Sequence, residues 1–158
     1  MEQKNLEEIK AENAKKKEYL RGYRDHVRMV TRIEAELEEI REIKTSISAS
    51  CDGMPRGSSR QKDLSGYAAT YDSLERVLLE ERYQRILTYQ DISHRIKRLR
   101  SRYENDTLFY RYIKGLEFWE IAEKMGFSER QIFRFHGRGL AHLELESEKD
   151  VSECQSNL

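Results

Sequence analysis

Side chains that can read nucleic-acid bases lie close together around residue 130. Arg130 and Arg134 are one helical turn apart, and a guanidinium matches the O6 and N7 acceptors of guanine. Gln131 can pair in a similar way with adenine, and Glu129 can accept a hydrogen bond from the amino group of cytosine. Ser128 precedes them as a candidate N-cap, and Gln131 three residues later completes a capping-box pattern. These residues at helical spacing favour contact with the major groove of double-stranded DNA.

Three further side chains of this segment are candidate DNA contacts. His136 and Arg138 lie further along the predicted helix and suit phosphate groups, as does the backbone at the helix N-terminus. Phe133 is expected on the exposed face. It suits a thymine methyl group or the sugar–phosphate backbone, or it is buried against another domain.

Residues 118–137 have the pattern of two short helices joined by a tight turn, which would position these side chains. Ala122 is small where the helices approach, Gly126 suits a left-handed turn, and Ile132 is a branched apolar residue on the second helix. We expect a helix from Glu104 to Ile113, a second from Glu117 to Met125, and a recognition helix from Ser128 to about Leu145. The expected buried stripe of the recognition helix consists of Ile132, Phe135, Leu140 and Leu143.

Gly137 and Gly139 lie inside the predicted recognition helix, where each costs about 1 kcal/mol relative to Ala. Close packing against a neighbouring helix would compensate. Trp119 is interpreted as a packing residue beside the hydrophobic face, with a DNA-backbone contact as the alternative.

The 158 residues have a net charge of zero that is unevenly distributed. From His94 to Leu140 there are eleven Lys or Arg against six Asp or Glu, a net charge of +5. From Ala141 onward there are five acids and one Lys, a net charge of −4. The positive charge surrounds the candidate DNA-reading residues, where it would attract phosphate.

The first hundred residues have the pattern of two long charged helices. Apolar stripes run from about Asn5 to Ile47 and from about Leu64 to Tyr103, and the stretch 48–63 has no periodicity. The expected second stripe is Tyr67, Tyr71, Leu74, Leu78, Ile86, Tyr89, Ile92, Ile96, Leu99 and Tyr103. The helices must pair, because neither stripe can remain in water. An antiparallel hairpin is the simplest solution, a coiled coil between chains is the alternative, and a dimer of hairpins combines both.

A hairpin that turns near residue 55 makes residue i face roughly residue 110 − i. This register places Arg24, Arg28 and Arg32 near Glu75, Glu80 and Glu81. It also places Lys15, Lys16 and Lys17 near Arg95, Lys97 and Arg98. Either an anionic partner neutralises this second group, or its members are solvated helix faces.

The composition favours neither an enzyme nor a membrane protein. The chain has no Gly-rich phosphate loop or nucleophile motif, and its four His lack metal-ligand spacing, so we expect no catalytic, metal or cofactor site. No stretch approaches the ~20 apolar residues of a membrane span, and the first residues lack a signal-peptide core. Cys51 and Cys154 are interpreted as free thiols, and a cytoplasmic protein is expected.

The stretch from Leu108 to Leu143 resembles region 4 of σ70-type factors, which recognises the promoter −35 element. The segments Arg111–Gly115, Ile121–Gly126 and Ser128–Ile132, followed by Gly139-Leu140, carry the resemblance. The arrangement also resembles small phage and prophage proteins of Gram-positive bacteria, in which such a domain follows a charged helical half. The segment Met54-Pro55-Arg56-Gly57 looks like a loop of that group.

Periodicity and composition predict an all-α protein with three parts: a helical hairpin or coiled coil (1–103), a helix-turn-helix domain (104–146) and an acidic disordered tail (147–158). The resemblance has the same order, with a charged helical half before the σ region-4-like domain. It implies a sequence-specific, DNA-binding transcription regulator of phage or prophage origin, with RNA polymerase as a candidate partner. No counterpart of the domain that melts the −10 element is seen, so initiation by this chain alone is not expected. The alternatives are a DNA-packaging protein similar to a small terminase subunit, and a helical scaffold that uses the motif for protein contact. A homodimer is left open.

Overall fold

The computed structural model describes the backbone of residues 2–49 and 60–145, and the side chains of residues 6–46 and 66–145. Within these ranges every regular element is helical, which confirms the all-α fold class. The elements are α1 (Glu2–Ala49), α2 (Arg60–Lys97), α3 (Arg102–Leu108), the π-helix η1 (Phe109–Lys114), α4 (Phe118–Met125) and α5 (Glu129–His142). The predicted tail and the segment Met54-Pro55-Arg56-Gly57 lie outside the described residues.

The two long helices differ from the prediction mainly at their ends. Both α1 and α2 extend into the stretch 48–63 that was expected to be a loop. At its other end α2 stops at Lys97, so Tyr103 belongs to α3 rather than to α2. The side chain of Asn105 donates a hydrogen bond of 3.1 Å to the carbonyl oxygen of Ile96. This bond satisfies one of the carbonyls that a helix leaves unpaired in its last turn.

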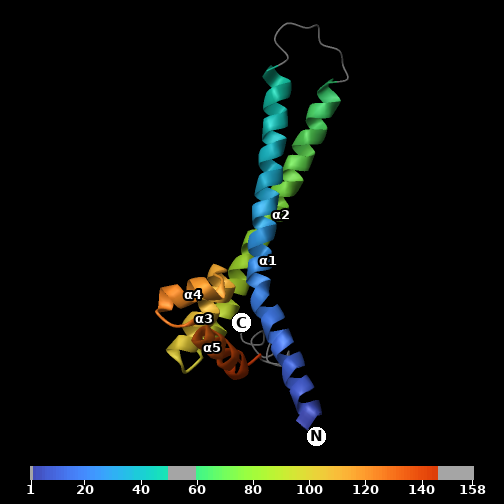
Figure 1. Ribbon diagram of the computed structural model, residues 1–158. Coiled ribbons are helices and arrows are strands. Elements are labelled where there is room, and N and C mark those ends of the chain that lie inside the picture. The colour runs from blue at the N-terminus through green and yellow to red at the C-terminus, as the bar shows by residue number, and fades with distance from the viewer. Residues whose placement is uncertain (1, 50–59, 146–158) are drawn as a thin grey trace, which may run out of the picture. The chain divides into compact units, whose positions relative to one another are not determined.

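Residues Arg24–Thr88 form one compact unit, called here the two-helix unit. In it α1 and α2 lie side by side and run in opposite directions (Figure 1). His26 contacts Glu81 at 2.9 Å, whereas Arg41, further along α1, donates to the hydroxyl of Tyr71 at 2.6 Å. The core of this unit consists of Val30, Ile33, Leu37 and Leu78. The two helices therefore bury their stripes against each other.

Two of the three α1 arginines that were expected near acids of α2 form ion pairs within their own helix. Arg28 forms an ion pair with Asp25, and Arg32 pairs with Glu36 at 3.0 Å, both within α1. Such pairs one turn apart need no partner helix. Between the two helices, Arg82 forms an ion pair with Glu34 at 2.7 Å.

The prediction for the middle of the stripe on α2 fails at Ile86, whereas the ring of Tyr89 lies 5.7 Å from that of Tyr23 on α1. Ile86 is 51% exposed and Tyr89 is 39% exposed. The residues that share the helix face of Leu78, at steps of three and four, are Glu81, Arg85, Thr88 and Ile92. Glu81, Arg85 and Thr88 are half-buried, and Ile92 is fully buried. Helical phase thus places polar side chains at the interface there and leaves Ile86 outside it.

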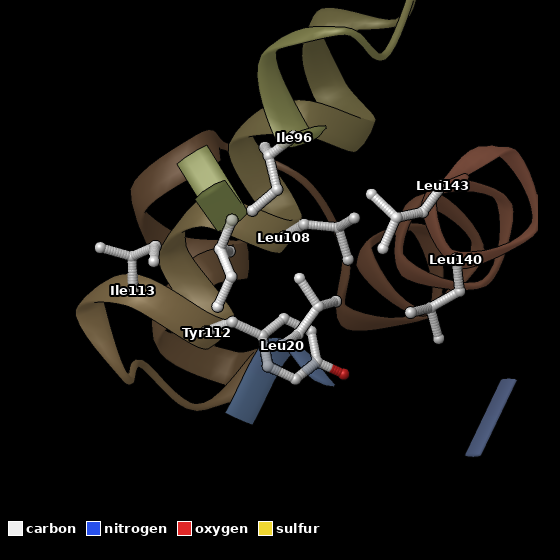
Figure 2. Packing of buried hydrophobic residues seen from close by; sticks show 8 residues of the cluster. Leu20, Ile96, Leu108, Tyr112, Ile113, Leu140 and Leu143 are labelled. Atoms are coloured by element: carbon white, nitrogen blue, oxygen red, sulfur yellow. The ribbon is translucent and has the colours of Figure 1, made fainter. Parts of the chain in front are cut away.

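The second compact unit, called here the α5 unit, joins α1 as far as Tyr23 to everything described from Tyr89 onward. Leu20 from α1, Ile96 from α2, Leu140 near the end of α5 and Leu143, which directly follows α5, converge on Leu108 of α3 (Figure 2). Ile92, Tyr112 and Ile113 complete this core. The division of the chain into compact units therefore differs from the boundary at residue 103 that the sequence pattern suggested.

Lys16 and Arg95, two of the six cations expected to crowd together in this unit, have partners inside the chain. Lys16 is only 5% exposed and pairs with Glu12 at 2.7 Å. Arg95 pairs with Asp91 at 3.0 Å and lies over the ring of Tyr19. These contacts offset part of the positive charge within the chain itself.

Candidate nucleic-acid interface

The connection from α4 to α5 is a tight turn with defined ends. The backbone N–H of Glu117 donates to Oε2 of Glu120 at 2.6 Å, which fixes the start of α4. Gly126 ends the helix at φ 72°, a left-handed conformation that glycine adopts at little cost, and Phe127 N–H donates to the Ala122 carbonyl at 3.0 Å. Ser128 occupies the N-cap position of α5 as predicted. Its side chain makes no cap hydrogen bond, so the capping box predicted from Ser128 and Gln131 does not form.

A small core holds α5 against α4. Ile121 and Ile132 are fully buried, and Ala122 and Phe135 are nearly so. The ring of Tyr103 stacks on Phe135 with centroids 5.3 Å apart. Ala122 of α4 and Ile132 of α5 therefore belong to the same core.

The face of α5 opposite this core carries most of the predicted site residues. Exposed side chains are those of Ser128, Glu129, Arg130, Gln131, Phe133, Arg134 and Arg138. Gln131, Arg134, Gly137 and Arg138 line a surface hollow. Arg138 is already engaged, since it lies over the Phe135 ring at 5.3 Å and approaches Glu104 at 3.8 Å. The hydrogen-bond donors with the fewest contacts inside the chain are in the N-terminal half of α5.

His136 does not belong to this face, and its assignment as a phosphate contact is wrong. It is only 9% exposed, and its Nε2 lies 3.0 Å from the hydroxyl of Tyr112 in a hydrogen bond. Burial, together with the positive charges of Lys17 and Arg111, lowers the pKa of His136 to about 4. The ring is therefore neutral near pH 7 and has no charge to offer a phosphate.

The two glycines of α5 have different surroundings. A Cβ added at Gly139 would lie 3.2 Å from Leu108 of α3, so close packing explains this glycine, as predicted. A Cβ at Gly137 would meet nothing within 4 Å. Packing inside the chain therefore does not require a glycine at position 137.

Sequence reasoning missed a stack of side chains that joins η1, α4 and α5. Arg111 donates to the Leu116 carbonyl at 2.9 Å, pairs with Glu117 at 2.9 Å, and lies 4.7 Å from the ring of Phe118. The ring of Phe133 packs on the same Phe118 at 4.4 Å. Spacing along one helix gives no signal for this stack, because its members lie on three different elements.

Two other side chains differ from expectation or were not singled out. Trp119, interpreted as a packing residue, is 56% exposed, so about half of its surface is open to solvent. Glu104, which is 4% exposed, accepts a hydrogen bond of 2.8 Å from His142 and lies near Arg138. A buried carboxylate needs such partners, and here it ties α3 to the second half of α5.

Among residues with described side chains, no cluster of three or more His, Cys, Asp or Glu is suited to hold a metal ion. No helix within the described ranges is long and apolar enough to cross a membrane. Comparisons with family models, with curated proteins and with solved structures found no match for this chain.

Proposed function

We propose that this chain is a sequence-specific, DNA-binding transcription regulator of phage or prophage origin, and that α5 reads the major groove. One observation carries the proposal. The first two turns of α5 present Arg130, Gln131 and Arg134 to solvent, while Ile132 and Phe135 fix the helix on α4. A rigid helix whose exposed N-terminal half carries donors for base edges is what major-groove recognition requires.

The proposed roles follow from position on α5. Arg130 and Arg134 suit guanine, Gln131 suits adenine, and Glu129 accepts from cytosine. Ser128 and the backbone N–H groups at the start of α5 suit a phosphate. Arg138 has a smaller role, because Glu104 and Phe135 already engage it. His136 has no direct role and is a supporting residue.

The resemblance of residues 108–143 to σ70 region 4 suggests what such binding is for. A unit of this kind would act on transcription beside RNA polymerase. A DNA-packaging role and a scaffold role remain the alternatives, since both also use helical corners and long paired helices.

Selection from random double-stranded DNA, followed by sequencing, tests the proposal at two salt concentrations. Wild type should enrich one motif, and Arg130→Ala/Arg134→Ala should not. The matched control is Arg28→Ala/Arg32→Ala, which removes the same charge at the same spacing from exposed sites on α1. This control should enrich the wild-type motif.

Other outcomes point to the alternatives. If all three proteins bind without a motif and only salt changes the affinity, the contact is with phosphate alone, and packaging becomes the better proposal. If none binds at any salt concentration, the α4–α5 unit contacts a protein instead.

A further inference from the structure

Phe133 is a large apolar side chain on a face otherwise made of polar groups. It is 51% exposed, although Ile132 beside it is fully buried. Exposing an aromatic ring to water is unfavourable, and single exposed apolar residues are nevertheless common on proteins. Exposure alone therefore assigns no role to Phe133, and its surroundings must decide.

The ring of Phe133 is held in place from one side. It packs on Phe118 with centroids 4.4 Å apart and the planes tilted by 40°. The guanidinium of Arg111 lies against that same Phe118 ring, and its bonds to Leu116 and Glu117 fix it. A supported ring loses little further side-chain freedom when its open face meets a ligand, which favours binding.

The position of Phe133 on α5 decides which ligand group it can meet. It is three residues after Arg130 and next to Arg134, so it flanks the two arginines in the half of the helix proposed to enter the groove. In the major groove the 5-methyl group of thymine is the apolar feature of the base edges, and Phe is among the side chains that contact it.

We propose that Phe133 reads the 5-methyl group of one thymine, next to the bases read by Arg130 and Arg134. This inference rests on the proposed function, because it requires α5 to lie in the major groove. The inference assigns thymine as one of the bases read and Phe133 as a residue that determines specificity. It also assigns the Phe133 contact to a base rather than to the sugar–phosphate backbone.

The test replaces thymine by deoxyuridine, which differs only in lacking the methyl group. The probe is the preferred duplex from the selection by wild type, resynthesised with deoxyuridine at each thymine position in turn. At one position the substitution should weaken binding by wild type about fourfold, as expected for one methyl group removed from an apolar contact. Phe133→Ala should bind both duplexes equally, and Phe133→Leu should keep most of the discrimination.

Trp119→Ala is the matched control, because it removes another half-exposed aromatic side chain from the same pair of helices. It should discriminate between the duplexes as wild type does. Thermal unfolding of each variant, followed by circular dichroism, verifies that the fold is retained.

The inference is overturned if no deoxyuridine substitution affects wild type, or if every one affects wild type and Phe133→Ala equally. Either result would mean that Phe133 contacts sugar or protein rather than a methyl group. A selection in which wild type enriches no motif would instead overturn the proposed function on which the inference rests.

Discussion

His136 is a buried histidine on a helix whose other polar residues face solvent. It bonds to Tyr112 of η1, and its ring lies edge-on against Phe118. The pair Tyr112–His136 thereby fixes the rotation of α5 against the preceding elements. Since a protonated imidazole would be costly at this site, the stability of the α5 unit depends on pH.

The direction of this dependence follows from the lowered pKa of His136, about 4 in the folded chain against an ordinary 6.5. Between these values the unfolded chain binds a proton and the folded chain does not. The free energy of unfolding therefore falls as the pH falls below about 6.5, by about 2 kcal/mol between pH 7 and pH 5. Urea unfolding at several pH values, followed by the fluorescence of Trp119, measures this change.

His136→Gln is the control, since Gln can still bond to the Tyr112 hydroxyl but does not titrate. Its loss of stability between pH 7 and pH 5 should be smaller than that of wild type by about the same 2 kcal/mol. An equal loss in both proteins would show that other groups cause the pH dependence.

On α5, helical spacing predicted which residues are buried more successfully than chemical residue type predicted what they contact. Ile132, Phe135 and Leu140 are buried as their spacing required. His136 lies four residues after Ile132 and four before Leu140, so the same spacing would have placed it inside. Its assignment to phosphate came from its chemistry instead. The support of Phe133 by Arg111 and Phe118 was not predictable, because it depends on how three elements pack.

At the scale of elements, α2 is the clearest case in which local phase decides burial. Leu78 is 8% exposed in the core with Val30, Ile33 and Leu37, whereas Ile86 is 51% exposed. Leu78→Ala should lower the free energy of unfolding of the two-helix unit by about 2 to 5 kcal/mol, because it leaves a cavity. Ile86→Ala should change it by roughly 0.5 kcal/mol or less. Hydrogen exchange of residues 24–46 and 66–88 measures both effects.

Comparable losses from the two substitutions would contradict the register of α2, and would mean that Ile86 is buried in solution, in the chain or between chains. Repeating the exchange at two protein concentrations separates these cases, since only burial between chains depends on concentration.

The ends of helices followed local signals only in part. Gly126 ends α4 as its residue type predicted, because the left-handed conformation is a property of the residue itself. The early end of α2 involves Asn105, which bonds to the last turn from a different helix. The start of α4 depends on Glu117 and Glu120, whereas the pattern around Ser128 suggested a similar box that does not form. Sequence patterns identify candidate capping residues, and tertiary packing determines which of them form a cap.

At the scale of the whole molecule, periodicity revealed long helices but not how the chain divides into compact units. An apolar stripe on α1 shows that other elements must pack against this helix, but it does not show which elements. Leu20 and Leu37 belong to one continuous stripe on one helix, yet they lie in different cores. Leu20 packs with Ile92, Ile96 and Leu108, and through them with the end of α5. The candidate DNA-binding helix is therefore supported by residues near the start of the chain.

This division makes a prediction for two identical substitutions on α1. Leu20 is fully buried in the α5 unit, and Leu37 is 5% exposed in the two-helix unit. Leu20→Ala should reduce the hydrogen-exchange protection of residues 104–143 by about 3 kcal/mol, the typical cost of such a cavity, and affect residues 66–88 less. Leu37→Ala should have the opposite pattern, since its cavity opens in the other core. Because α1 is continuous through both units, each substitution will have some effect beyond its own core. The quantity to compare is therefore the ratio, for each variant, of the protection lost in residues 104–143 to that lost in residues 66–88. If Leu20→Ala left residues 104–143 as protected as in wild type, those residues would form a core without α1, which would favour the predicted domain boundary near residue 103.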